Sequence, residues 1–423
     1  MTSALAVEAP TRRGPSLITW LIIALVAARV AALVYLLVSH QDTVDGGLVG
    51  DIRRYVEMST AKGTPYRDFQ VEYPPVTFAL IRVLTGSNLY RSIALVAVSQ
   101  FICDLGIAAL LRWVWDRRTM VAYLVLGLPL ICWPFVYARI DLFSALLAVG
   151  GLALVRKGRD IEGGGLLAVA VLAKIWPFAV APVLIVERRV KGLAAFAIAG
   201  ATLAIAWFAL AGSAGVRQVV SFRDATGWQV ESVPGILWHL HDPSRVKFES
   251  GAFRTGVMPT WGRPLLTALS LTFIVLAWWM AARRRNDGAD DHVVYALAPL
   301  VSVLALLIFA PILSPQYVVW MLPFAALVVA RGDRLVAGLT AGITIITTVS
   351  YVFVVDAANG DVWAIAPVLV RNILLVALLV VAVQLLVGAR ATAPIAGSTD
   401  GSASGPAPGA TSTPNGATAS ASA

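Results

Sequence analysis

The stretch LITWLIIALVAARVAALVYLLVS, residues Leu17–Ser39, is apolar over a length that decides the class of fold. A helix needs about 20 apolar residues to cross the hydrocarbon core of a bilayer, and backbone polar groups inside lipid must be bonded within the segment. Similar stretches recur along the 423 residues, of which 58% are hydrophobic and 13% charged. Soluble domains are only about 45–50% apolar. The sequence therefore predicts an all-α, polytopic integral membrane protein.

Short basic clusters separate these stretches, which is the pattern expected of cytoplasmic turns in a membrane protein. They account for the net charge of +9 and argue against nucleic-acid binding. On this topology both termini are cytoplasmic, and the chain lies in the cell (plasma) membrane. We expect about ten full spans, each near the length required to cross a bilayer. The expected spans are 17–39, 89–113, 121–137, 142–155, 193–211, 264–282, 293–310, 317–330, 335–355 and 363–386.

Three regions follow from this pattern. Residues 1–16 form a cytoplasmic amino-terminal segment, and residues 17–388 form the transmembrane domain, with outward loops at 40–75 and 212–262. Residues 391–423 are rich in Ala, Ser, Thr, Gly and Pro and nearly uncharged. Such a composition favours a disordered tail, which we place in the cytoplasm.

The segment Gly163–Val186 has basic clusters on both sides but room for only one crossing. Lys174 and Pro177 divide it into two stretches of about 16 Å or less, at a helical rise of about 1.5 Å per residue. We expect a re-entrant pair of half-helices with Lys174 at its tip, because irregular backbone at membrane depth is tolerated where protein or a wet cavity surrounds it. The alternative is one crossing kinked at Pro177, which would send Arg283–Arg285 to the outer face.

The first outward loop concentrates charge in a chain that has little elsewhere. Its residues 44–75 read VDGGLVGDIRRYVEMSTAKGTPYRDFQVEYPP and include Asp45, Asp51, Asp68 and Glu72. Asp51 opens a short amphipathic segment, where an acid stabilises a helix start by capping and through the helix dipole. It is also placed to act as a general base at the outer interface, taking the proton of a sugar hydroxyl. The spacing leaves both interpretations open.

Glu72 and Tyr73 precede two prolines, Pro74 and Pro75. Proline fixes its own φ and favours extended backbone in the residue before it. The loop therefore ends stiffly before Val76–Leu84, an apolar segment too short to span. This stiffness is either purely structural or aims the carboxylate and the phenol into a substrate cavity.

Charged side chains at membrane depth cost about 2.5–3.5 kcal/mol each on insertion scales and are functional candidates for that reason. Arg139 and Asp141 lie in a tight outward turn, where they either bind substrate or form a mutual ion pair. Lys174, at the expected tip of the half-helix pair, is a lone ammonium. It would hold the phosphate of a lipid-linked donor, or else snorkel to an interface.

Other polar groups near the ends of spans suit sugar binding. Gln316 can donate and accept hydrogen bonds, as sugar hydroxyls require. Its neighbours Tyr317 and Trp320 are also typical of an aromatic belt. Arg371 lies about two turns into the last span. The histidines of the second outward loop have no convincing metal set beside them, and we expect no metal and no cofactor.

The chain contains no phosphate-binding P-loop, dinucleotide fingerprint, nucleophile elbow or HExxH motif. A nucleotide-sugar donor therefore has no visible soluble binding domain. Any sugar donor would have to arrive through the membrane.

Short motifs along the chain occur together in a known family. In order they read GTPYRDF, EYPP, ARIDLFSALL, AKIWPF, QVES, SPQYVVWMLP and RNILL. Between Asp51 and Leu375 the chain resembles glycosyltransferase family 87. Members of that family are polytopic enzymes of the GT-C type and include α-mannosyltransferases of phosphatidylinositol-mannoside synthesis.

The resemblance implies a GT-C-like helical bundle whose outward loops form the active site. It also implies a polyprenyl-phosphate-sugar donor, usually carrying mannose, and catalysis on the outer face. The family's catalytic carboxylate lies in a D…Y element that Asp51 and Tyr55 match here, and Asp45 is close enough to be the alternative base. The QVES and RNILL motifs add Glu231 and Arg371 as candidate substrate-binding residues.

We therefore expect an inverting transfer of a sugar to a lipid-linked or cell-envelope glycan acceptor. Asp51 would act as general base, while Arg139 and Lys174 would hold the departing phosphate. The sugars would be oriented by Glu72, Tyr73, Asp141 and Gln316. The main alternative is a secondary transporter or flippase of a lipid-linked envelope precursor, with broken helices meeting at the bilayer midplane. A catalytically inactive scaffold of envelope assembly is a third possibility.

Overall fold

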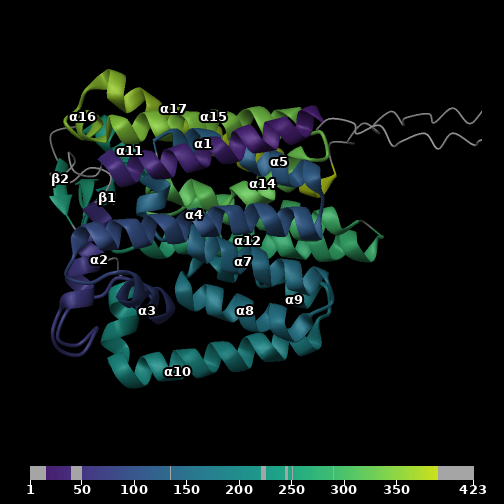
Figure 1. Cartoon of the computed structure of the whole chain (residues 1–423), viewed down its shortest axis with the longest axis horizontal. Helices are drawn as coiled ribbons and strands as arrows, with labels where there is room; N and C mark the ends of the chain where they lie inside the picture. The colour runs from purple at the N-terminus through teal and green to yellow at the C-terminus, as the bar shows by residue number, and fades with distance from the viewer. Residues whose placement is uncertain are drawn as a thin grey trace, which may run out of the picture. The chain divides into compact units, whose positions relative to one another are not determined.

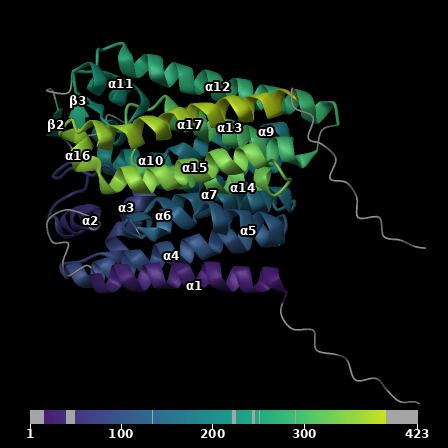
Figure 2. The same ribbon diagram turned by 90° about the horizontal axis from the view of Figure 1, so that it is seen from above.

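The computed structural model describes residues 16–39, 50–133, 135–220, 225–242, 246–249, 251–288 and 290–388. In this part of the chain the long helices lie side by side, and a small sheet and several short helices gather at one end of the bundle (Figure 1, Figure 2). The expected segment 1–16, apart from Ser16, the tail 391–423 and the carboxylate Asp45 lie outside the described residues.

The elements follow one another in this order. The first half contains α1 (Leu17–Ser39), α2 (Gly50–Thr60), α3 (Pro75–Leu84), α4 (Leu89–Val114), α5 (Arg117–Leu126), α6 (Leu128–Cys132), the 3-10 helix η1 (Phe135–Ala138), α7 (Asp141–Arg156), α8 (Asp160–Ala173), η2 (Trp176–Ala179), α9 (Val183–Val186) and α10 (Val190–Val220). The second half contains β1 (Trp228–Gln229), α11 (Val233–His241), β2 (Val246–Glu249), β3 (Ala252–Thr255), α12 (Gly262–Asn286), the π-helix η4 (Val293–Leu297), α13 (Ala298–Ile308), the 3-10 helix η5 (Pro315–Trp320), α14 (Leu322–Val329), α15 (Arg334–Val352), α16 (Val354–Ala358) and α17 (Val362–Val387).

Six helices of the described residues are long and apolar enough to cross a membrane: α1, α4, α10, α12, α15 and α17. The predicted polytopic membrane fold is thus confirmed. The other four expected spans are shorter or interrupted, and they correspond to α5 with α6, to α7, to η4 with α13, and to η5 with α14. A full crossing needs about 20 residues. We expected about ten full spans, whereas six helices in this part of the chain have that length.

Burial sorts the helices into a centre and a periphery. Helices α13 and α14 bury almost every side chain, whereas the most apolar window of α10 buries none. A helix that is apolar yet uncovered by protein presents its side chains to lipid. Helix α10 is therefore a peripheral, lipid-facing helix, and it packs against α8.

The segment Gly163–Val186 leaves and returns at the same end of the bundle. Asp160, at the start of α8, and Arg189, just after α9, form an ion pair with 3.5 Å between their charged atoms. Helix α8 ends at Ala173, and its C-cap Lys174 is extended rather than helical. This is the arrangement expected of two half-length arms with Lys174 at the bend. A single crossing would have put Asp160 and Arg189 about 30 Å apart, at opposite faces of the hydrocarbon.

The second outward loop differs from the expectation of an all-α chain with a loop beginning at residue 212. Helix α10 continues past Gly212, where φ is +60° and the helix kinks, and ends at Val220. Beyond it the strands pair antiparallel in the order β1-β3-β2, and the N-cap of α11 is Ser232, whose side chain accepts a hydrogen bond from Gly235 N. These strands have two to four residues each, too few for a period-two pattern to predict them.

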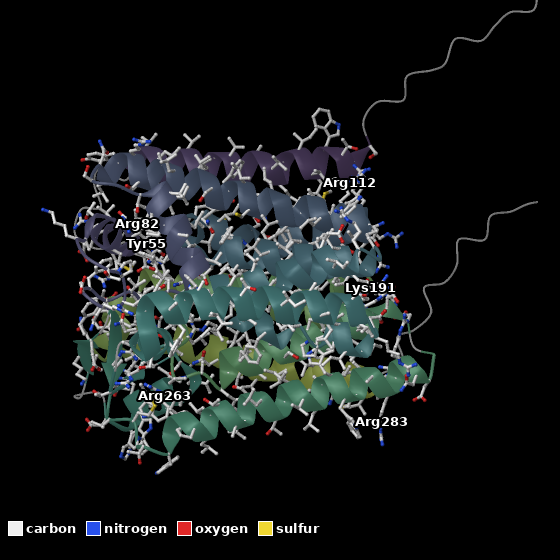
Figure 3. All side chains as sticks on the ribbon, turned by 90° about the horizontal axis from the view of Figure 1, so that it is seen from below. Tyr55, Arg82, Arg112, Lys191, Arg263 and Arg283 are labelled. Carbon is white, nitrogen blue, oxygen red and sulfur yellow. The ribbon has the colours of Figure 1, made fainter. Side chains whose placement is uncertain are left out.

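Basic residues lie at both ends of the bundle. Arg112, Lys191 and Arg283 lie at one end, and Tyr55, Arg82 and Arg263 lie at the other (Figure 3). The second end also carries α2, the sheet and α16 (Figure 1, Figure 2). The candidate site residues are therefore sought at the end that holds both polar loops.

Candidate active site

Asp51 lies in the first turn of α2, a helix fixed on the bundle by its buried side chains Ile52, Tyr55 and Met58. Its carboxylate forms an ion pair with Arg139, with 2.7 Å between Oδ2 and Nε. The Asp51 side chain is 40% exposed and the Arg139 side chain only 8%. An accessible acid is thus held by an enclosed cation, which a residue that merely starts a helix would not require.

The turn between η1 and α7 supplies both Arg139 and Asp141, but their ion pairs go to other elements. Arg139 pairs with Asp51 of α2, and its Nη2 donates to the hydroxyl of Tyr351 on α15 at 3.3 Å. Asp141 pairs with Lys174 at 2.5 Å. These pairs take the place of the mutual Arg139–Asp141 pair that the sequence left open.

Lys174 is not the lone ammonium that we expected. Its Nζ binds Asp141 Oδ1, and the same oxygen accepts a hydrogen bond from Trp320 Nε1 at 2.9 Å. The Asp141 side chain is 4% exposed and the Lys174 side chain 16%. An enclosed carboxylate and an enclosed ammonium neutralise each other here, so a bound anion is not needed to explain Lys174.

Aromatic rings form a stack beside this pair. Tyr317 and Trp320 are stacked with 4.3 Å between ring centroids, and Trp176 stacks on Trp320 at 5.3 Å. Lys174 Nζ lies 4.7 Å from the centre of the Tyr317 ring and 5.2 Å from that of Trp320, within cation–π range. Trp320 is buried, so it packs around Lys174 and Asp141 rather than in an aromatic belt.

Glu72 and Tyr73 are brought to the same end of the bundle as Asp51. Arg54 of α2 binds both carboxylate oxygens of Glu72, at 3.1 and 3.2 Å, and Tyr66 donates to Tyr73 O at 2.6 Å. The rings of Tyr73 and Tyr55 meet edge to face at 5.7 Å. Glu72 thus braces the loop against α2, and Tyr73 packs on Tyr55, one turn after Asp51 on that helix.

Burial raises the pKa of Tyr55, and the negative charge of Asp51 adds to the effect. Burial likewise raises the pKa of Tyr73. Both phenols therefore keep their protons in neutral water and can donate hydrogen bonds. At neutral pH the negative charge beside these two phenols is therefore that of Asp51.

Glu231 and Arg371 form a second buried pair, with 3.8 Å between their charged groups. Gln229 donates to Glu231 Oε2 at 3.0 Å, and Arg371 also donates to the main-chain oxygen of Glu231. Burial raises the pKa of Glu231 to about 7, an increase that Arg371, Gln229 and Arg139 partly oppose. Arg371 is fully buried, so it holds the loop that carries Glu231 and has no open face for a substrate.

Gln316 is buried in η5, directly before Tyr317.

Among the described residues, no group of three or more His, Cys, Asp or Glu side chains could hold a metal ion.

An apolar cavity of about 600 Å³ opens between α8 and α10. Two of its lining residues, Ile175 and Pro74, directly follow Lys174 and Tyr73 in the chain. The remaining lining residues are Val171, Leu172, Ala204, Ile205, Trp207, Phe208, Ala209 and Val216.

Several of these site residues were not singled out as candidates from the sequence. Tyr351 lies in an apolar segment that looks like an ordinary span, Trp176 lies in the apolar half-helix segment after Lys174, and Arg54 looks like one more charge in a polar helix. The one available signal was the AKIWPF motif, which places Trp176 two residues after Lys174.

Taken together, these features define a polytopic membrane protein with a cluster of enclosed ion pairs at one end of its bundle. The family model for glycosyltransferase family 87 matches residues 71–315, which is more than half of the chain. The protein belongs to glycosyltransferase family 87. It is therefore a membrane glycosyltransferase of the GT-C type, and this replaces the transporter alternative.

The matched range is shorter than the resemblance noted in the sequence, which ran from Asp51 to Leu375. It contains Glu72, Arg139, Lys174 and Glu231 but not Asp51. The crystal structure of ArnT from Cupriavidus metallidurans in the apo state is similar to that of this protein over 88% of this chain and 78% of that one, with 17% identity and a TM-score of 0.43. No curated protein matches the sequence.

Proposed function

We propose that this glycosyltransferase moves a sugar from a polyprenyl-phosphate donor to a lipid-linked or cell-envelope glycan acceptor at the outer face of the plasma membrane. The observation that carries the proposal is the ion pair between accessible Asp51 and enclosed Arg139. Mannose, the sugar that the family resemblance suggests, is the first candidate for transfer.

In the proposed reaction Asp51 is the general base. Its carboxylate takes the proton of the acceptor hydroxyl as that oxygen bonds to the anomeric carbon. The bond from the anomeric carbon to the phosphate oxygen breaks, and its electron pair leaves with polyprenyl phosphate. A single displacement of this kind inverts the anomeric configuration. A positioned base of this type contributes about 10²–10⁴ in rate.

The charges near Asp51 suit a donor with one negative charge. A sugar joined to a polyprenyl phosphate is a phosphodiester and carries one negative charge. When Glu231 is protonated, as its pKa of about 7 allows, the site has three cations against two acids. The cations are Arg139, Lys174 and Arg371, and the acids are Asp51 and Asp141. One anion then balances the site, with Arg139 and Lys174 closest to where charge develops on the phosphate.

The sugar would lie between these groups. Tyr73 would donate to sugar hydroxyls, Gln316 would donate and accept, and Glu72 would keep the loop in place. Tyr317, which is less buried than Trp320, lies beside Lys174 and would contact the C–H face of a pyranose. Asp141 would act mainly by holding Lys174.

The apolar cavity between α8 and α10 supports a lipid-linked donor. It begins one residue from Lys174, so a donor phosphate at Lys174 would direct its isoprenoid chain into the cavity. Apolar surface removed from water contributes about 25 cal/mol per Å², and such a chain gains it without any polar contact. The cavity lies along α10, the lipid-facing helix, which allows entry from the bilayer.

The proposed orientation rests on the basic clusters that the sequence assigns to cytoplasmic turns. Arg112, Lys191 and Arg283 belong to such clusters and lie at the end of the bundle away from Tyr55, although Arg82 and Arg263 lie at the Tyr55 end (Figure 3). The proposed site and both polar loops then face outward, with both termini in the cytoplasm.

The experiment is a transfer assay with the purified protein in lipid nanodiscs. Labelled polyprenyl-phosphate mannose, other polyprenyl-phosphate hexoses and a nucleotide sugar are each offered with a panel of glycolipid acceptors. We expect labelled product from a polyprenyl-phosphate donor alone, with an anomeric configuration opposite to that of the donor by NMR. Transfer from the nucleotide sugar, or retention of configuration, would refute the proposal.

A further inference from the structure

A buried carboxylate lies inside the bundle, away from the site. Asp104 of α4 accepts hydrogen bonds from Arg29 Nε at 2.9 Å, from Tyr123 OH at 2.6 Å and from Tyr137 OH at 2.8 Å. The three donors come from α1, α5 and η1. All four side chains are buried, so Asp104 ties four separate elements together.

Holding helices together with a buried charged cluster costs desolvation free energy. Ions enclosed by apolar surroundings are costly to desolvate, and well-packed apolar residues often replace a buried ion pair without loss of stability. Ionisable groups within membrane segments are correspondingly rare and tend to serve function. Helix packing alone therefore does not explain Asp104.

The cluster is linked to the site by η1. Tyr137 precedes Arg139 by two residues, and Gln100, one turn before Asp104 on α4, accepts from the main-chain nitrogen of Phe143 at 3.1 Å. Both side chains project from the same face of α4, because residues four apart are neighbours on a helix. Helix α4 thus anchors the chain before Arg139 and after Asp141.

A ring contact supports the same turn from the other side. Phe135, at the start of η1, stacks on Tyr351 with 4.4 Å between ring centroids and 19° between planes. Tyr351 in turn accepts the hydrogen bond from Arg139 Nη2. The segment around Arg139 is therefore held both by α4 and by α15.

We infer that Asp104, acting through Tyr137, is a positioning residue that fixes Arg139 against Asp51. This inference rests on the proposed function, in which the Arg139–Asp51 pair is the reacting centre. A displacement of about 1 Å at such a centre can cost 10²-fold in rate even when the mutated residue lies far from it. Without the Tyr137–Asp104 bond, η1 keeps its ring contacts but loses its one anchor to a fixed charge.

The chain provides a matched pair of variants. Tyr137→Phe and Tyr123→Phe each remove one hydroxyl that donates to the same carboxylate, and both rings are buried. Only Tyr137 belongs to the segment that carries Arg139. We expect Tyr137→Phe to lower kcat about tenfold, a factor typical of a lost hydrogen bond to a charged group, with the donor KM unchanged within about twofold. Tyr123→Phe should keep the wild-type kcat.

A second measurement separates positioning from a loss of stability. In an Arg139→Lys background, removal of the Tyr137 hydroxyl should have almost no further effect on kcat, because residues acting through one another are not additive. Equal kcat losses in the two tyrosine variants, or full additivity with Arg139→Lys, would overturn the inference.

A third measurement does not depend on turnover. Hydrogen–deuterium exchange across residues 135–143 should accelerate in Tyr137→Phe and stay at the wild-type rate in Tyr123→Phe. Unchanged exchange in both variants would overturn the inference even if sugar transfer is found. Faster exchange in Tyr137→Phe alone would support it even if the protein transfers no sugar from a polyprenyl donor, an outcome that counts against the proposed function only.

Discussion

Replacing Glu231 by glutamine should change how the stability of this protein depends on pH. Burial raises the pKa of Glu231 from the ordinary 4.5 to about 7. Between these two pH values the folded protein keeps a proton that the unfolded chain has released. The stability contributed by the protonated group is complete below about pH 4.5, declines as the pH rises, and is lost above about pH 7.

The size of the effect follows from the width of that window. Between the two pKa values, each pH unit changes the free energy of unfolding by about 1.4 kcal/mol for one group. The free energy of unfolding therefore falls by on the order of 3 kcal/mol between about pH 4.5 and about pH 7. Glutamine has nearly the same shape and no ionisation. The Glu231→Gln variant should therefore gain stability relative to wild type as the pH rises, even though both proteins share every other titrating group.

The assay is thermal unfolding of the purified proteins in one detergent, from about pH 4.5 to about pH 8. We expect the midpoint of Glu231→Gln to rise relative to wild type across that range by several degrees. The control is Glu57→Gln, because the Glu57 side chain is 65% exposed and its variant should track wild type at every pH. A constant difference between Glu231→Gln and wild type, or one that favours wild type at higher pH, would refute this account of the Glu231–Arg371 pair.

Two further predictions test the neighbouring pair and the apolar cavity. Lys174→Met leaves the buried Asp141 carboxylate without its cation, which typically costs about 3–5 kcal/mol of folding stability. The Lys174→Met/Asp141→Asn double variant removes the uncompensated charge and should recover part of the lost thermal midpoint. A double variant less stable than Lys174→Met would contradict the pairing. Ala204→Trp should fill the cavity and raise the KM for a long-chain polyprenyl donor about tenfold, equivalent to about 1.4 kcal/mol. The KM for a short-chain analogue should stay unchanged. Ala206→Trp, on the same helix but outside the cavity lining, is its control, and equal changes for both chain lengths would argue against lipid binding there.

Hydropathy and charge along the sequence predicted the elements whose formation depends on neighbouring residues alone. The long apolar helices, the short amphipathic α2 and the returning arms around Lys174 all follow from hydropathy and basic clusters. Span length was harder to predict, because α5 and α6 are separated at Gly127 inside what looks like one apolar run. Strands of two to four residues left no detectable period.

The site was predicted as a set of residues but not as a set of contacts. Asp51 and Arg139 come from elements far apart in the chain, and only tertiary packing decides that Arg139 meets Asp51. For the same reason Lys174, which looked unpaired on its own segment, has its partner on α7. Arg371 was expected to bind substrate, but it donates to the main-chain oxygen of Glu231. A guanidinium inside a span is a functional candidate from the sequence, but its partner cannot be predicted from the sequence.

The most direct test of the central claim compares donor binding with turnover in Asp51→Asn. Binding of a labelled polyprenyl-phosphate sugar and its transfer are measured on the same preparation, with Glu57→Gln of the same helix as the matched carboxylate control. The account predicts that Asp51→Asn binds the donor like wild type and transfers sugar about 10²–10⁴ times more slowly, while Glu57→Gln does both normally. Wild-type transfer by Asp51→Asn would contradict it.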